Sequence, residues 1–462
     1  MPIFDRGNRQ DLDQLVEEYT TTNNINRRQF LQRATAAGLS ISAASALLAA
    51  CGGGTSSSSS SAPTSVDVLA VWSGNELTNF QMINTAFNQK TGIKVNVETT
   101  RDLPTVLNTR VRANNPPDVT GNPSISQFHS LITAGKVIRL DSILDMNSIH
   151  ANYSQDWLNL VTFNGGLYGV VMLANSKGTV WYNPKQFTAS GYTVPTTWND
   201  LITLSDKIAG SGKYPWALGV SSGAASGWPA SDWIDQIYLN LNGPDMSDSW
   251  VAHKIPWTDP SVKNAFQMFG QIAHGNHYIN GGAQAILATG FQDASYLPYD
   301  SPPKAYMDYL GDFLVGFITA QFPSLQAGTD YNFFNFPTIT QAYAGAITGG
   351  ADTVFALKDN SAIRQYLQYL STAEAQEIWV KQGGKSSVNK SVPLSAYPNA
   401  VAAAAGKQLS QAPIFRNSQD DLMPSAVETA YWQGVVAYIQ NPGNLSSILS
   451  TIESTAASSY TS

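Results

Sequence analysis

The sequence has a single cysteine, few charged side chains and no long hydrophobic run. Cys51 is the one cysteine among 462 residues, so no disulfide can form within the chain. Charged residues make up 13% of the sequence, compared with roughly 25% in an average domain. The formal net charge is -7, and no dense stripe of lysine and arginine follows the N-terminal segment. These features argue against a nucleic-acid partner.

The N-terminal segment predicts export from the cytoplasm. Arg-Arg-Gln-Phe-Leu at 27–31 precedes an apolar run of small residues at 34–50. A basic stretch, a short apolar run and small residues before a cleavage site are typical of an export signal, and this run is too short to remain in a bilayer as an anchor. The twin arginines resemble the twin-arginine export signal, although Asn26 and Gln32 depart from its usual pattern.

Leu-Ala-Ala-Cys at 48–51 resembles the bacterial lipobox, which implies that a lipidated Cys51 begins the mature chain. A lone buried thiol is the alternative, but the Gly- and Ser-rich segment that follows could bury nothing. Two or three acyl chains would hold the protein firmly, whereas one chain anchors weakly. Residues 1–50 are therefore predicted to be an export signal, and residues 51–65 the lipidated cysteine with a flexible tether on the extracytoplasmic face of the membrane.

The remaining body alternates predicted strands and helices. This body is longer than the chains that usually fold around a single hydrophobic core, so we expect two lobes. An apolar run at 66–72, a helical pattern at 77–90 and a period-two pattern at 93–97 predict a strand–helix–strand unit. The next expected elements are a helix at 102–114, a short strand at 118–119 and a helix at 125–132. This alternation predicts an α/β fold with parallel strands.

Further helices are expected later in the chain. Thr197 is a plausible N-cap for a helix ending near Ile208. Helical patterns also cover 362–370, 373–380 and 425–439.

Several short motifs follow one another along this body. No single motif is specific for a protein family, but their order is informative. They are WSG at 72–74, KTGIKV at 90–95, PPDV at 116–119, GLYG at 166–169, WYNP at 181–184, PTTW at 195–198, GWPASDW at 227–233, GGAD at 349–352, GG at 383–384, DLMP at 421–424 and YW at 431–432. In this order they resemble the extracellular solute-binding proteins of ABC importers for carbohydrates, in the branch similar to maltose- and α-glucoside-binding proteins. The resemblance covers residues 66–451.

The resemblance implies a periplasmic-binding-protein-like fold of two α/β lobes, joined by a hinge that the chain crosses more than once. Lobe one would comprise 66–173 plus 337–387, and lobe two 174–336 plus 388–462. Such lobes close around a ligand in the cleft between them. The implied function is that of a monomeric substrate-binding lipoprotein, not an enzyme, which passes an α-glucoside-like oligosaccharide to permease subunits and needs no cofactor or metal.

A pyranose has an apolar face of C–H groups and a rim of hydroxyls, so its site needs aromatic faces beside carboxylates and amides. Loops beyond the carboxyl ends of strands place such groups in open α/β sheets. Trp72, Ser73 and Glu76 stand there, after the first strand. The alternatives are a core role for Trp72 and a helix-dipole role for Glu76. Asp118 is expected at the cleft edge, unless it is a helix N-cap or turn residue.

The resemblance adds positions from both lobes. The resemblance implies that Trp228 and Trp432 stack on the sugar. Phe313 stands where many relatives carry tryptophan. It keeps an aromatic ring but lacks the indole N–H donor. The remaining candidates are Asn175, Gly227, Asp232, Asp312, Gly350 and Asp352.

An extracytoplasmic hydrolase is the alternative function. Gly219–Gly223 is a literal GxSxG, but the glycines and proline that follow argue against the helix that a nucleophile elbow requires. A glycosidase would need two carboxylates across a scissile bond, for which Asp118, Asp232 and Asp352 are candidates. His274 and His277 are spaced to share a helical face, but no cluster of further metal ligands accompanies them.

Overall fold

The protein is described by a computed structural model that covers residues 64–122 and 125–460. The predicted export signal, Cys51 and nearly all of the tether lie outside these residues. Within the described part of the chain, no helix has both the length and the apolar character needed to cross a membrane.

The first sheet begins with the expected strand–helix–strand unit. β1 (Ser65–Ala70) and β2 (Lys94–Thr99) are parallel neighbours connected by α4 (Gly74–Thr91). Phe80, Ile83 and Phe87 share one buried face of α4, which explains why this segment packs as a helix on the sheet. Gly92 ends the helix in the left-handed conformation, with φ 75°, that suits glycine.

Parallel and antiparallel pairs are mixed in this sheet. Its other strands are β3 (Val119–Asn122), β6 (Gly169–Ser176), β11 (Ile347–Ala356) and β12 (Phe415–Asn417). β3 is parallel to β1, and β11 runs antiparallel to β3 and β6 and parallel to β12. The strand order is β12-β11-β3-β1-β2, with β6 also paired to β11. The prediction of parallel strands is therefore confirmed for β1, β2 and β3, whereas β11 brings antiparallel pairs.

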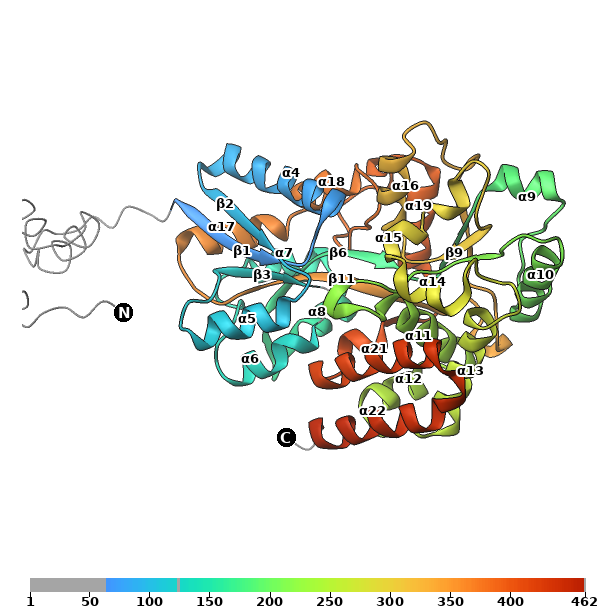
Figure 1. The fold of residues 1–462 in the computed structure, drawn as a ribbon. Coiled ribbons are helices and arrows are strands. Elements are labelled where there is room, and N and C mark those ends of the chain that lie inside the picture. The colour runs from blue at the N-terminus through green and yellow to red at the C-terminus, as the bar shows by residue number, and fades with distance from the viewer. Residues whose placement is uncertain (1–63, 123–124, 461–462) are drawn as a thin grey trace, which may run out of the picture. The chain divides into compact units, whose positions relative to one another are not determined.

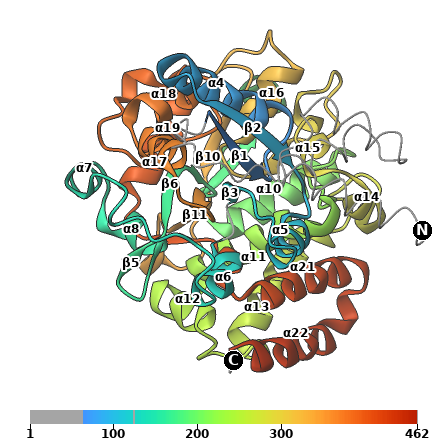
Figure 2. The ribbon, with the colours of Figure 1, turned by 90° about the vertical axis from the view of Figure 1, so that its left-hand side faces the viewer.

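Helices lie on both sides of β1 and β2, with α4 above and α5 and α6 below in Figures 1 and 2. α4 also packs beside α18, although the two are far apart in sequence (Figure 1). The elements around the first sheet are α5 (Leu103–Arg112), α6 (His129–Thr133), α7 (Met146–Asn152), α8 (Gln155–Leu160), the hairpin β4 (Thr162–Phe163) and β5 (Gly166–Leu167), α17 (Ser361–Leu370) and α18 (Ala373–Val380).

A second, smaller sheet has the order β10-β7-β9-β8. Its strands are β7 (Thr179–Tyr182), β8 (Trp216–Ala217), β9 (Met307–Tyr309) and β10 (Asn332–Asn335). The larger helices of this part are α9 (Pro184–Ser190), α10 (Trp198–Gly210), α11 (Trp228–Asn242), α12 (Pro244–Val251), α13 (Pro260–Ala273), α14 (Gly282–Ala288), α16 (Leu314–Gln321), α21 (Ser425–Gln440) and α22 (Leu445–Ser459). Two short helices complete it, α15 (Phe291–Ala294) and α20 (Gln419–Leu422). α19 (Ala400–Gln411) packs against β6 of the first sheet.

Most predicted helices are confirmed to within a few residues. α17, α18 and α21 match the predicted spans, and Thr197 caps α10 through a capping box with Asp200. The helix predicted at 125–132 is broken into a 3-10 turn (Ser126–Phe128) followed by the short α6.

Two main hydrophobic cores underlie the two sheets. The first takes its buried residues chiefly from 66–174 and 347–380, and the second from 180–336 and 423–456. A smaller cluster around Trp181, Phe313 and Phe317 lies apart from both. The chain passes from the first sheet to the second between β6 and β7 and returns between β10 and β11. The predicted lobe limits remain a prediction.

Candidate functional site

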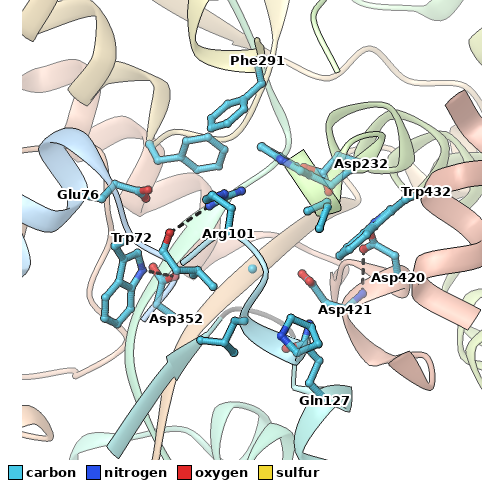
Figure 3. A pocket seen from close by; sticks show the side chains of 18 of the residues that line it. Trp72, Glu76, Arg101, Gln127, Asp232, Phe291, Asp352, Asp420, Asp421 and Trp432 are labelled. Carbon is cyan, nitrogen blue, oxygen red and sulfur yellow. Dashed lines mark hydrogen bonds between the residues drawn. The ribbon is translucent and has the colours of Figure 1, made fainter. Parts of the chain in front are cut away.

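A pocket of about 470 Å³ lies between residues of the first core and the smaller cluster around Phe313 and Phe317 (Figure 3). Small-molecule sites usually span roughly 300–1,000 Å³. The pocket is bordered by the loop after β1, the β6 and β11 strands, the start of α11, and helices α20 and α21. It therefore includes the carboxyl end of a parallel strand, where ligand sites in open α/β sheets gather.

Four aromatic side chains pack together at one side of the pocket. The ring of Phe291 lies 5.0 Å from that of Trp228 and 5.8 Å from that of Phe317, and Phe313 lies 5.9 Å from Trp228, all between centroids. We name Trp228, Phe291, Phe313 and Phe317 the aromatic wall. The buried Nε1 of Trp228 has no hydrogen-bond partner among the described residues. Because an indole N–H can only donate, it is an unsatisfied donor at the side of the pocket.

Trp72 borders the pocket and is also part of the first core. Its ring lies 4.5 Å from Phe80 and 5.8 Å from Trp379, and the side chain is 1% exposed. Its Nε1 donates to Asp352 Oδ1 at 3.3 Å. Gly121 makes room for the indole, because a Cβ there would lie 2.5 Å from the ring. The two interpretations of Trp72, core residue and pocket residue, therefore both describe part of its position.

Lys385 forms a buried ion cluster with Glu76 and Asp352, which we name the Lys385 cluster. Its Nζ lies 2.7 Å from Asp352 Oδ2 and 3.1 Å from Glu76 Oε1. Burial lowers the pKa of the Lys385 ammonium, but Asp352 and Glu76 outweigh burial and leave the pKa raised. The lysine is therefore charged and fixes the two carboxylates at the edge of the pocket.

A second buried cluster consists of Lys177, Asp232, Asp420 and Asp421, and we name it the Lys177 cluster. Lys177 Nζ lies 2.6 Å from Asp232 Oδ1 and 3.6 Å from Asp421 Oδ2. Burial raises the pKa of the Asp232 carboxyl, Lys177 offsets part of that rise, and Asp420 and Asp421 add to it, so the pKa is about 7. Figure 3 shows Asp232, Asp420 and Asp421 across the pocket from Glu76 and Asp352.

Asp420 holds the indole of Trp432 in place. Asp420 Oδ2 accepts a hydrogen bond from Trp432 Nε1 at 2.9 Å and another from Ser231 Oγ at 2.6 Å. Gly227, in the left-handed region with φ 110°, lies against the same tryptophan, since a Cβ there would be 2.4 Å from the Trp432 carbonyl oxygen. The start of α11 and the middle of α21 therefore fit together only with glycine at 227.

Arg101 connects the two sides of the pocket. It follows β2, and its Nη1 donates to the carbonyl of Val71 at 3.2 Å while Nη2 donates to Ser222 Oγ at 2.9 Å. The guanidinium carbon also lies 5.9 Å from the centroid of the Phe291 ring.

The structure brings most of the predicted site residues to this one pocket. Those that line it are Trp72, Glu76, Asn175, Trp228, Asp232, Phe313, Gly350, Asp352 and Trp432. Asn175 in β6 faces Gly350 in β11, and its buried Oδ1 has no hydrogen-bond partner in the described part of the chain.

Three other predicted residues lie beside the pocket without lining it. Ser73 precedes α4 as its N-cap residue, and Gly227 has the packing role described above. Asp312 is buried and accepts a hydrogen bond from Ser386 Oγ at 3.3 Å. Burial raises the pKa of Asp312, the ammonium of Lys385 offsets part of the rise, and the value is about 7.

The expectation for Asp118 is corrected. β3 begins at Val119, so Asp118 stands at the amino end of the strand, opposite to the end that faces the pocket. There its Oδ2 accepts from the Asp67 amide at 2.9 Å and its Oδ1 lies 2.9 Å from Lys358 Nζ. It stabilises the start of two parallel strands, which agrees with the alternative of a turn residue.

The sequence analysis missed several residues that line the pocket. They are Arg101, Gln127, Lys177, Phe291, Phe317, Lys385, Asp420 and Asp421. A signal was available only for the acids, because adjacent Asp420 and Asp421 precede the recognised Met-Pro motif. Single lysines and phenylalanines carry no such signal.

The GxSxG segment has no nucleophile elbow. β8 ends at Ala217, and Gly223–Ala225 forms a 3-10 turn where an elbow would begin its helix. The central serine of the motif is Ser221, whose backbone forms an isolated β-bridge with Gly290. In residues 64–122 and 125–460, no group of three or more His, Cys, Asp or Glu side chains is arranged to hold a metal ion.

Two α/β parts with a pocket between them define the periplasmic-binding-protein fold. The structure resembles that of the bacterial solute receptor AcbH, with a TM-score of 0.74 and 22% identity over 86% of this chain and 99% of that one. AcbH is described as having an exclusive preference for β-D-galactopyranose. At this identity the likeness concerns the fold.

The sequence comparisons identify the family. The profile described as bacterial extracellular solute-binding protein matches residues 73–377. The chain is 33% identical to the osmoprotective compounds-binding protein GgtB of Synechocystis sp., covering 84% of this chain and 91% of GgtB. It is 30% identical to the alpha-glucosides-binding periplasmic protein AglE of Rhizobium meliloti, covering 81% and 83%. The chain belongs to the bacterial extracellular solute-binding protein family, whose members bind solutes without catalysis.

Proposed function

We propose that this protein captures a neutral saccharide of the α-glucoside type outside the cell membrane and delivers it to the permease of an ABC importer. The observation that carries this proposal is the composition of the pocket. The aromatic wall lies in the same cavity as buried polar atoms without partners among the described residues, Trp228 Nε1, Asn175 Oδ1 and Asp232 Oδ2. Rings suit the C–H face of a pyranose, and the polar atoms suit its hydroxyls.

The relatives support the choice of ligand class. AglE is named for alpha-glucosides and GgtB for osmoprotective compounds, and both align with more than four fifths of this chain. A neutral polyol or glucoside fits both names. The proposed ligand contacts are the predicted residues that line the pocket, together with Arg101, Lys177, Lys385, Asp420 and Asp421.

The proposed mechanism is closure of two lobes on the ligand. Lobe one would comprise 66–173 plus 337–387, and lobe two the remainder of the body, with the chain crossings near β6–β7 and β10–β11 as hinges. Glu76, Asp352 and Lys385 would contact the ligand from lobe one, while the aromatic wall and the Lys177 cluster would contact it from lobe two. A ligand that touches both lobes favours the closed state by its extra contacts there.

We propose further that the protein is a lipoprotein held at the membrane by Cys51 after twin-arginine export. The support is the sequence pattern at 27–51. Labelling with a radioactive fatty acid should mark the wild type and not Cys51→Ser, and Arg27→Lys combined with Arg28→Lys should block export. Labelled Cys51→Ser would contradict the anchor.

Calorimetric titration with maltose, maltotriose, cellobiose and xylobiose tests the binding function. We expect micromolar affinity for an α-linked saccharide, about -8 kcal/mol, and an unchanged saccharide when the mixture is later separated by chromatography. Product formation would favour a hydrolase, and an absence of binding would contradict the proposal.

Trp228→Ala should weaken binding more than tenfold, because it removes both a stacking face and the free indole donor. Trp157→Ala is the matched control: Trp157 is also a half-buried tryptophan, but it packs against Phe415 outside the pocket. Equal losses in the two variants would indicate general instability instead of a contact with the ligand.

A further inference from the structure

Carboxylates outnumber basic groups in the Lys177 cluster. Asp232, Asp420 and Asp421 are each at most 6% exposed, and Lys177 forms ion pairs with Asp232 and Asp421. Asp235, one turn further along α11, is fully buried and accepts a hydrogen bond from the Asp420 amide at 3.2 Å. Burying several ionised carboxylates beside one ammonium is costly, so such a group holds protons instead.

The groups around Asp232 come from several elements. Lys177 lies between β6 and β7, Asp235 on α11, and Asp420 and Asp421 on α20. The other titratable groups facing Asp232 are Tyr309 of β9, whose hydroxyl donates to the Asp232 carbonyl at 3.1 Å, and Tyr431 of α21, whose hydroxyl donates to Asp235 Oδ1 at 3.0 Å. Apart from Lys177, every titratable group in this set is acidic.

Asp232 is the member of the cluster that has both a raised pKa and a carboxylate oxygen with no hydrogen-bond partner among the described residues at the edge of the pocket. It lines the pocket, its Oδ1 is bound to Lys177, and its Oδ2 has no hydrogen-bond partner among the described residues. A hydroxyl donating to Oδ2 would stabilise the ionised carboxylate, because a hydrogen bond to the charged form favours that form.

We infer that binding of a saccharide in this pocket releases a proton from the Lys177 cluster, at Asp232. The inference rests on the proposed function and adds a regulatory property to the same site. The saccharide hydroxyl keeps its own proton and donates a hydrogen bond to Oδ2, while the proton carried by the Asp232 carboxyl passes to solvent. Affinity therefore rises with pH across the neutral range and falls in acid.

The pKa of the Asp232 carboxyl supports the release of a proton on binding. Its pKa of about 7 in the free protein means that the carboxyl is partly protonated at neutral pH. If binding lowers that pKa by about one unit, roughly half a proton is released per ligand at pH 6.5 and the association constant is about sevenfold smaller at pH 5.5 than at pH 8. Asp420 also holds Trp432, so the same cluster fixes an aromatic face of the pocket.

The test is calorimetric titration of the wild-type protein with maltose, maltotriose, cellobiose and xylobiose at pH 5.5, 6.5 and 8. Each titration at pH 6.5 is repeated in two buffers of different ionisation enthalpy, because the difference in heat counts the protons released. We expect the release of about half a proton at pH 6.5 and an affinity about sevenfold lower at pH 5.5 than at pH 8. Binding with no proton exchange and equal affinities at the three pH values overturns the inference and leaves the proposed function intact. An absence of binding at every pH rejects the proposed function itself.

Three variants assign the proton to Asp232. Asp232→Asn should bind with equal affinity at pH 5.5 and 8. Asp235→Asn is the matched control, because it removes a buried acid of the same helix that does not line the pocket, and its pH dependence should equal that of the wild type. Asp352→Asn, in the Lys385 cluster, should weaken binding about equally at both pH values.

A pH dependence retained in Asp232→Asn overturns the assignment. If that variant does not fold, Asp421→Asn provides the second measurement. Removing the charge of Asp421 lowers the pKa of Asp232, so the midpoint of the affinity curve should move to lower pH. An unmoved midpoint also overturns the inference.

Discussion

The two lysine clusters on either side of the pocket are built alike, each with one buried lysine among carboxylates, but they differ in where the acid with a raised pKa lies. Lys385 has two acid partners, Glu76 and Asp352. Lys177 has Asp232 and Asp421 as partners, with Asp420 in the same group. Burial lowers the pKa of each lysine, and in both cases the acids outweigh it. Beside each lysine, burial is the main cause that raises the pKa of one acid to about 7, Asp232 near Lys177 and Asp312 near Lys385. The difference is that Asp232 lines the pocket and Asp312 does not.

This comparison shows how a pocket for neutral ligands can carry many charges. Each lysine holds its acids in fixed positions, so their remaining lone pairs face the cavity as hydrogen-bond acceptors. In the Lys385 cluster the two acids that line the pocket, Glu76 and Asp352, are both paired with the lysine and act as fixed acceptors. In the Lys177 cluster the acid with the raised pKa, Asp232, lines the pocket itself, so the proposed response to pH arises there.

The largest effect is expected from removing the lysines. Lys177→Met and Lys385→Met should each lower the free energy of unfolding by about 3–5 kcal/mol at pH 8, because each leaves buried carboxylates without a counter-charge. Lys177→Met should be the more severe, since the acids around Lys177 are all buried, whereas the Glu76 side chain beside Lys385 is 20% exposed. Its loss should shrink at pH 5.5, where Asp232 takes up a proton. Urea unfolding at both pH values measures this.

Lys381→Met is the control for the lysine variants. Lys381 forms an exposed i,i+4 pair with Glu377, with a lysine side chain that is 58% exposed, so its removal should cost less than 1 kcal/mol. If Lys177→Met lost the same free energy at pH 5.5 and pH 8, the proposed excess of acid around Lys177 would be refuted.

A smaller effect is expected from Gly227→Ala, which disturbs one side of the pocket alone. The left-handed φ and the contact with the Trp432 carbonyl should together lower the free energy of unfolding by about 3 kcal/mol. The change should displace Trp432 from Asp420 and weaken saccharide binding, while the Lys385 cluster stays intact. Gly210→Ala is the control, with ordinary φ and no atom within 4 Å of the added Cβ. Equal stability of the two variants would contradict this account of Gly227.

Asp308→Asn measures what burial does to an acid with no lysine beside it. Asp308 in β9 forms no ion pair with any described residue, and burial raises the pKa of its carboxyl to about 7 despite a hydrogen bond with Ser295. A raised pKa means that the folded state holds the proton more tightly than the unfolded state. This stabilisation is complete below about pH 4 and is lost as the pH rises through about 7.

Between pH 5 and pH 8, the wild type should therefore lose about 2 kcal/mol more of its free energy of unfolding than Asp308→Asn does. Thermal unfolding at intervals of half a pH unit measures the difference. Parallel stability curves for the two proteins would show that Asp308 does not titrate in this range.

Sequence patterns predicted the fold well where contacts are local. The β1–α4–β2 unit and the Thr197 capping box depend on residues a few positions apart, and both are confirmed. Asp118 was misplaced because the predicted strand began one residue early. Because β3 begins at Val119, Asp118 is not part of the strand but precedes it.

The ion clusters could not be predicted, for a physical reason. Lys177 is 55 positions from Asp232, and Lys385 is more than 300 from Glu76. Hydropathy patterns assign single lysines to the surface, because an unpaired buried ammonium is unstable. Only the tertiary fold brings the acids that make burial possible. The resemblance to a family supplied the aromatic and acidic candidates, but not these partners.

The indoles of Trp72, Trp228 and Trp432 border one cavity in a chain with 11 tryptophans. Their emission depends on the water and charges around each ring, so a solute that displaces water there should alter the intrinsic fluorescence of the protein. Trp432 is the most sensitive position, because its N–H is already bound to a carboxylate. The protein thus carries its own optical reporter of occupancy, and uptake could be followed in real time without attaching a dye.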